Sequence, residues 1–84
     1  MNKARRAELE KIVERIADLR VMADEIKTDL EAIRDEEQDY FDNMPESLQG
    51  GEKGENAQTE IDAMEEAINA LEEIDSVEYT GAQT

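Results

Sequence analysis

The chain contains no cysteine and no histidine, and these two absences remove several classes of chemistry. Without cysteine there is neither a disulfide framework nor a thiolate nucleophile. With both residues absent, the Ser-His-Asp and Cys-His arrangements, the usual zinc sites and the Glu-x-x-His motif of di-iron bundles are excluded. The sequence therefore predicts no catalytic residue, no cofactor site and no metal site, and we expect a protein that is not an enzyme.

Aromatic side chains and long apolar runs are also scarce. The chain has two tyrosines and one phenylalanine, and its other apolar residues are mostly Leu, Ile, Ala and Met, which favour helix over sheet. No run approaches the roughly 20 apolar residues of a membrane span. Charged residues follow Lys3, Arg5 and Arg6, where a secretory signal requires apolar ones. We expect one small domain over residues 1–84, in a cytoplasmic protein with no membrane partner.

Positive charge becomes rare after residue 20. Residues 1–20 hold six bases and four acids, whereas residues 21–84 hold three bases and twenty acids, and the formal net charge is −15. Such a surface repels nucleic acid and anionic membranes, and it attracts basic partners over about a Debye length. We therefore expect no nucleic-acid partner and consider a protein with a basic surface. The alternative is that the charge serves only solubility.

What the chain does contain is a regular heptad repeat. Apolar residues follow one another at spacings of three and four, which places them on one side of a helix that packs against a partner helix. This pattern predicts a helix over about residues 3–42, with a length of roughly 60 Å. The residues of the repeat are Leu9, Ile12, Ile16, Leu19, Ala23, Ile26, Leu30 and Ile33.

Residues 43–52 interrupt the repeat and predict a reversal of the chain. Pro45 disfavours helix at Met44, Gly50 and Gly51 tolerate positive φ angles, and a single helical turn can begin at Pro45. A second apolar stripe then predicts a helix over about residues 53–77, before a frayed tail at 78–84. The predicted fold is all-α: a long helix and a shorter one form an antiparallel hairpin, which assembles into a dimeric helical bundle or coiled coil.

The first helix is longer than the second, so its first 17 or so residues are expected to extend beyond the hairpin. This overhang carries core-type residues, and we expect them to form the interface of an antiparallel homodimer. That alignment brings the bases near the N-terminus toward acidic stretches of the other protomer. The predicted interface residues are Leu9, Ile12, Val13, Ile16 and Leu19.

A second candidate surface lies at the loop end of the hairpin. Tyr40, Phe41, Met44 and Leu48 are apolar neighbours there. One interpretation is a small plug that closes the loop. The other is a docking patch for a partner protein, because aromatic anchors within a charged rim are typical of binding hot spots.

The acidic runs invite comparison with metal sites, for instance the paired carboxylates of all-helical nucleotide pyrophosphatases. The hairpin register places Glu37 and Asp75 far apart along the rod, so the acids near the seam do not converge. We interpret the runs as solvated charge. Two acids near the seam nevertheless require partners if they are buried, and the candidates are Arg20 for Asp75 and Arg34 or Lys53 for Glu37.

The linker carries a resemblance. The segment 34–55, and above all Asp42-Asn-Met-Pro-Glu-Ser-Leu-Gln49, resembles a linker of small acidic helical proteins of bacteriophages and prophages, and residues 61–74 are similar to their second helix. The resemblance implies a viral origin and a helical hairpin but no mechanism. Gly51 stands where we expect serine in that group, so the second helix has no side-chain acceptor at its start.

Three functions follow as hypotheses. The first is a phage-encoded acidic interaction protein that binds and modulates a host or phage protein, in the host cytoplasm, by presenting a DNA-like negative surface. The second is a structural or assembly factor of the phage, which the long regular heptads favour. The third, a metal-dependent nucleotide hydrolase, is the one that the residues support least.

Overall fold

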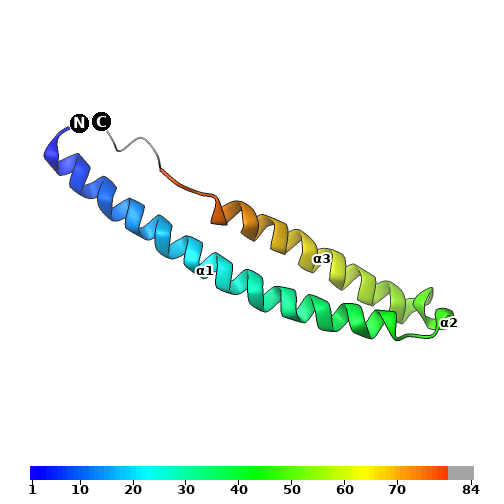
Figure 1. Ribbon diagram of the computed structural model, residues 1–84. Coiled ribbons are helices and arrows are strands. Elements are labelled where there is room, and N and C mark those ends of the chain that lie inside the picture. Colours follow the sequence, from blue (N-terminus) through cyan, green and yellow to red (C-terminus); the bar gives the residue numbers. More distant parts are fainter. Residues whose placement is uncertain (80–84) are drawn as a thin grey trace.

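The computed structural model describes residues 1–79 and contains three helices (Figure 1). Helix α1 spans Lys3–Asp42, α2 spans Glu46–Gln49 and α3 spans Glu52–Asp75. The all-helical prediction, with a long helix packed against a shorter one, is confirmed, and no strand occurs within the described residues. Residues 80–84 of the predicted frayed tail lie outside the described part of the chain.

Local side-chain chemistry sets the two far ends of the helices. The Asn2 side chain accepts a hydrogen bond from the Arg5 amide at 2.8 Å and so caps the start of α1. At the other end, the Ser76 hydroxyl donates to the Glu73 carbonyl at 2.7 Å and competes with the helical pattern there. The backbone amides of Ser76 and Val77 bond carbonyls three residues back instead of four, so α3 ends at Asp75, two residues before the predicted end near residue 77.

Helices α1 and α3 lie side by side and antiparallel, forming a rod of 67 × 15 × 14 Å (Figure 1). The Arg20 Nε donates to the backbone carbonyl of Asp75 at 2.7 Å, which places the end of α3 beside Arg20. The first part of α1, residues 3–19, therefore extends beyond α3, as the blue end of the ribbon shows. This segment is called the overhang below.

One row of α1 faces α3 and forms the seam of the hairpin. Its residues alternate at spacings of four and three, and all of them are buried or half-buried. On α3 the seam contains Ala57, Ile61 and Ile68, which are 2%, 1% and 3% exposed. The α3-facing row of α1 consists of Arg20, Ala23, Lys27, Leu30, Arg34, Glu37 and Phe41.

Three of these α3-facing residues are bases seven positions apart: Arg20, Lys27 and Arg34. All three are half-buried, as is usual for long basic side chains whose stems lie along apolar surface while their charged groups stay near water. The Lys27 ammonium lies 3.5 Å from the Glu72 carboxylate of α3. The row is therefore amphipathic and combines apolar packing with electrostatic contacts to α3.

Along the part of α1 that α3 covers, the prediction of one apolar seam is wrong for two residues of the repeat, Ile26 and Ile33. Ala23 is buried and Leu30 half-buried against α3, but Ile26 and Ile33 are 47% and 55% exposed. Helix α3 packs on the side of Ala23 and Leu30 that carries the bases, and it leaves the isoleucine side open. The heptad repeat therefore does not lie entirely between α1 and α3.

The reversal between α1 and α3 is built around α2. Pro45 precedes α2, and the Gln49 side chain donates to the Phe41 carbonyl at 3.1 Å, which ties α2 to the end of α1. Gly50 and Gly51 have φ angles of −86° and −94°, so the predicted positive φ angles are wrong. The position that requires glycine is Gly54, because a methyl group there collides with the Gln49 carbonyl.

A helix that crosses a membrane must be both long and predominantly apolar. None of the helices in residues 1–79 is both long enough and apolar enough to cross a membrane.

Candidate functional site

An exposed apolar stripe runs along most of α1. Its members lie seven residues apart, and because seven residues make about two helical turns, they share one side of the helix. The stripe from residue 12 to residue 40 is therefore about 42 Å long at 1.5 Å per residue. The α1 stripe consists of Ile12, Leu19, Ile26, Ile33 and Tyr40, which are 46%, 47%, 47%, 55% and 51% exposed.

Helix α3 continues this apolar surface on the same side of the rod. A shallow hollow is lined by Tyr40 of the α1 stripe together with Lys53, Asn56 and Glu60 of α3. Lys53, Glu60, Ala67 and Ile74 are seven residues apart, so they form one row on the side of α3 that adjoins Tyr40. Toward the end of α3 this row is uncharged.

The α1 stripe and the two α3 residues Ala67 and Ile74 are together called the apolar face. Ala63 and Ala70, in the adjoining row of α3, are exposed and add no charge. The apolar face thus extends over both helices. An exposed apolar surface of this length is unusual for a protein that functions alone, and such surfaces mark interaction sites.

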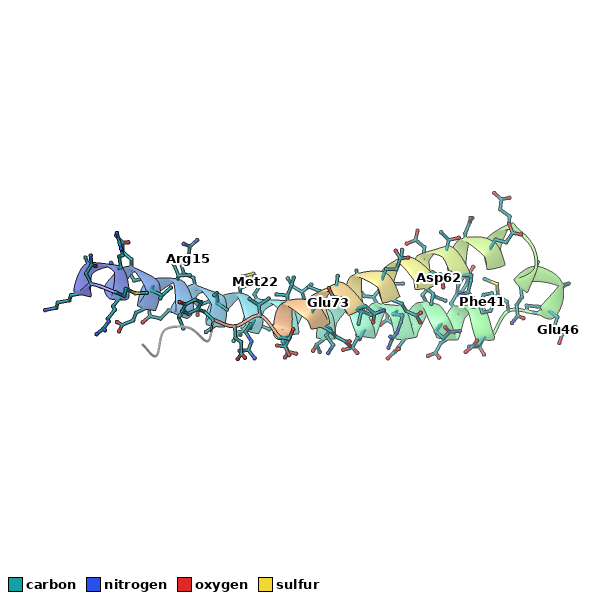
Figure 2. The ribbon with its side chains drawn as sticks, turned by 90° about the horizontal axis from the view of Figure 1, so that it is seen from above. Arg15, Met22, Phe41, Glu46, Asp62 and Glu73 are labelled. Carbon is teal, nitrogen blue, oxygen red and sulfur yellow. The ribbon has the colours of Figure 1, made fainter. Side chains whose placement is uncertain are left out.

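The exposed rows of α3 outside the seam and the apolar face are acidic. Every aspartate and glutamate of the chain is exposed except Glu31 and Glu37, which are half-buried. In Figure 2 carboxylate oxygens project along the rod, for instance at Glu46, Asp62 and Glu73, while nitrogen-bearing side chains gather toward the N-terminal end of α1, near Arg15. The acidic surface of α3 consists of Glu52, Glu55, Asp62, Glu65, Glu66, Glu72 and Glu73.

The five predicted interface residues of the overhang do not lie on one row. Ile12 and Leu19 belong to the α1 stripe, and Leu9 and Ile16 beside it are half-buried. Val13, 37% exposed, lies in line with Arg20 on the row that faces α3 farther along. A shallow groove lined by Ile12, Arg15, Ile16 and Leu19 confirms that the overhang has an apolar side.

Ile26, Ile33 and Tyr40 extend that side well beyond the overhang, and the sequence interpretation missed this. It assigned Ile26 and Ile33 to a single seam with Ala23 and Leu30. The sequence does contain a sign of two separate sides. Arg20, Lys27 and Arg34 directly follow Leu19, Ile26 and Ile33, so a row of bases runs beside the row of apolar residues.

The loop-end residues divide between two roles. Phe41 and Met44 are half-buried within the hairpin, whereas Tyr40 and Leu48 are 51% and 47% exposed. A second shallow pocket is lined by Tyr40, Met44, Pro45 and Leu48 together with Lys53. The burial of Phe41 and Met44 agrees with the plug interpretation, whereas the docking patch for a partner protein stays a prediction.

The acids near the seam do not pair as the sequence suggests. Arg20 contacts the backbone oxygen of Asp75, and Arg34 bonds the neighbouring Asp35 carboxylate at 3.0 Å. Half-buried Glu37 shares the hollow beside Tyr40 with Lys53. Among residues 1–79 no three acidic side chains come together in a way that could hold a metal ion.

Comparison with known proteins gives no family for this chain. No protein-family model matches it, and neither a curated protein nor a solved structure is similar to it.

Proposed function

We propose that this protein is an acidic interaction protein that binds and modulates a partner protein with a basic, nucleic-acid-binding surface. The observation that carries the proposal is the concentration of exposed carboxylates on the hairpin part of the rod. Residues 21–75 contain nineteen acids and three bases, a net charge of −16. These charges surround a seam in which no acidic side chain is fully buried.

The linear charge density supports a DNA-like role. Helix α3 has 24 residues, so the hairpin part is about 36 Å long at 1.5 Å per residue. A net charge of −16 over that length corresponds to roughly one charge per 2.3 Å, close to the value of about 1.7 Å for duplex DNA. A groove that binds DNA through lysine and arginine is therefore electrostatically suited to this surface.

Affinity capture from a bacterial lysate tests the proposal. The immobilised protein is expected to retain basic proteins, and both added salt and added duplex DNA are expected to release them, because each competes for the same charges. A variant with Glu65→Gln, Glu66→Gln and Glu73→Gln is expected to lose most of this binding. A matched control with Glu8→Gln, Glu10→Gln and Glu14→Gln removes the same charge from the overhang and is expected to retain it. Partners that resist DNA competition and bind both variants equally would contradict the proposal.

A second candidate is a structural or assembly role, which the shape favours. A rod 67 Å long and about 15 Å thick is suited to bridge two larger components. Together with the viral origin that the linker resemblance implies, this predicts a virion component. Mass spectrometry of purified particles separates the two candidates, since a regulator of host proteins is expected to be absent from particles.

A further inference from the structure

We infer that a second copy of this chain binds to the apolar face, packed antiparallel about a two-fold axis at Ile26. The inference rests on the apolar face and is independent of the acidic surface of α3, which points away from it. The occupant is identified by three properties of the face: its area, its self-complementary register and the charges that flank it.

The area is sufficient for a stable dimer. Two helices, together roughly 20 Å wide, flank the α1 stripe over about 30 Å from residue 20 to residue 40, and α1 alone, roughly 10 Å wide, continues it for about 12 Å over residues 12–19. This gives on the order of 700 Å² per protomer, close to the value of about 800 Å² that is typical of specific protein interfaces. The side chains along it are half exposed in the single chain, so most of their remaining apolar surface is available for burial.

The register is self-complementary. With the axis at Ile26, residue numbers of facing positions on the two α1 helices sum to 52. Ile26 then meets its own copy, Leu19 meets the other protomer's Ile33, and Ile12 meets its Tyr40. All five members of the α1 stripe are paired in this single alignment, as an isologous interface requires.

The lengths of the helices fit the same alignment. Because α3 ends beside Arg20, the overhang lacks a neighbour from α3 of its own chain. In the antiparallel dimer the overhang lies along the hairpin part of the other copy, and Ile12 and Leu19 enter the groove between that copy's α1 and α3. Ile12 then packs into the hollow beside Tyr40 of the other copy, which Ala57 and Glu60 also line.

Charge selects the antiparallel orientation over the parallel one. Arg15 of one copy lies level with Glu36 and Glu37 of the other, and the overhang, where bases exceed acids, lies beside the acid-rich end of α1. The two α3 helices then overlap over only about half of their length, roughly 18 Å at 1.5 Å per residue, and the other halves lie at opposite ends of the dimer. A parallel dimer instead places both hairpin parts, each with a net charge of −16, side by side, where like charges repel.

Cysteine cross-linking tests the register directly, because the chain has no cysteine of its own. Under oxidation the Ile26→Cys variant is expected to form a covalent dimer. Ile12→Cys alone is not, since its two copies lie about 42 Å apart in this register. A mixture of Ile12→Cys with Tyr40→Cys is expected to cross-link between the two variants. A parallel dimer would instead link Ile12→Cys to itself, and that result would overturn the proposal.

Sedimentation tests the interface without oxidation. The unmodified chain is expected to sediment as a dimer at about 20 μM. Ile26→Asp with Ile33→Asp is expected to raise the dissociation constant roughly 100-fold or more, because two charges per protomer become buried. The matched control, Val21→Asp with Thr28→Asp, adds the same charge to exposed positions on another side of α1 and is expected to remain dimeric. Helical circular dichroism monitors folding of both variants. A monomeric unmodified chain, or equal effects of the two variants, would overturn the proposal.

Discussion

The two sides of α1 differ in side-chain chemistry: the half-buried side includes bases, and the exposed side is apolar. The side that faces α3 contains three bases, Arg20, Lys27 and Arg34, whereas the α1 stripe, which lies beside the contact with α3, contains isoleucine, leucine and tyrosine. On the first side Lys27 pairs with Glu72 and Arg20 donates to the Asp75 carbonyl, while Arg34 bonds Asp35 of its own helix. On the second side the stripe residues stay about half exposed. The comparison teaches that the contact between α1 and α3 includes polar interactions as well as apolar packing.

The sharpest test of this comparison sets a seam isoleucine against a stripe isoleucine. Ile61 is 1% exposed, and Ile61→Ala is expected to lower the free energy of unfolding by about 2–4 kcal/mol, through lost apolar burial and a cavity. Ile33, 55% exposed, is the matched control. In dilute solution Ile33→Ala is expected to cost less than about 1 kcal/mol. Urea denaturation followed by circular dichroism measures both, and equal losses would show that the two sides are equally buried.

The next effect concerns the loop end that holds the two helices in register. Gly54→Ala is expected to destabilise the hairpin by about 1–3 kcal/mol, because the added methyl group displaces the Gln49 carbonyl and with it α2. Gly50→Ala is the control, since its methyl group meets no atom within 4 Å. The control is expected to be neutral or slightly stabilising. Thermal unfolding measures the difference, and an equal melting temperature for both variants would refute this role of Gly54.

A smaller effect is expected from the basic row of the seam. Lys27→Ala removes both the stem that packs on α3 and the ammonium that lies 3.5 Å from Glu72. The expected cost is about 0.5–1 kcal/mol. Lys27→Met keeps a stem of similar length without the charge, so it separates packing from pairing. If packing dominates, the Met variant unfolds at the same urea concentration as the unmodified chain, and a loss as large as that of the Ala variant would show that the ion pair dominates.

The smallest effect lies at the tip of the overhang. Asn2→Ala removes the acceptor for the Arg5 amide and is expected to weaken the first turn of α1 by about 0.5 kcal/mol, the low end for such caps, because this end of α1 has no neighbouring helix within residues 1–79. Asn2→Ser retains an acceptor and is expected to preserve the turn. Amide hydrogen exchange of residues 3–8 measures the local opening, which global unfolding barely reports. Unchanged exchange in the Ala variant would show that the cap does not limit fraying.

Much of the secondary structure follows from local patterns. The heptad repeat and the cluster of Pro45, Gly50 and Gly51 predict a long helix, a reversal and a shorter helix, because these signals act over a few residues. The segregation of acids after residue 20 is likewise visible in the chain alone. The end of α3 is the exception, since Ser76 bonds back to Glu73.

Which side of α1 packs against α3 is not decided by patterns within α1, in contrast to the secondary structure. Residues such as Leu30 lie between two candidate seams, one shared with Ile33 and one shared with Arg34, and periodicity is the same for both. Which seam closes depends on the surface of α3: its acids beside the seam favour the basic row, and this contact leaves Ile26 and Ile33 open. The requirement for glycine at residue 54 arises in the same way, because it depends on how closely α2 approaches α3, a distance that no pattern within either helix encodes.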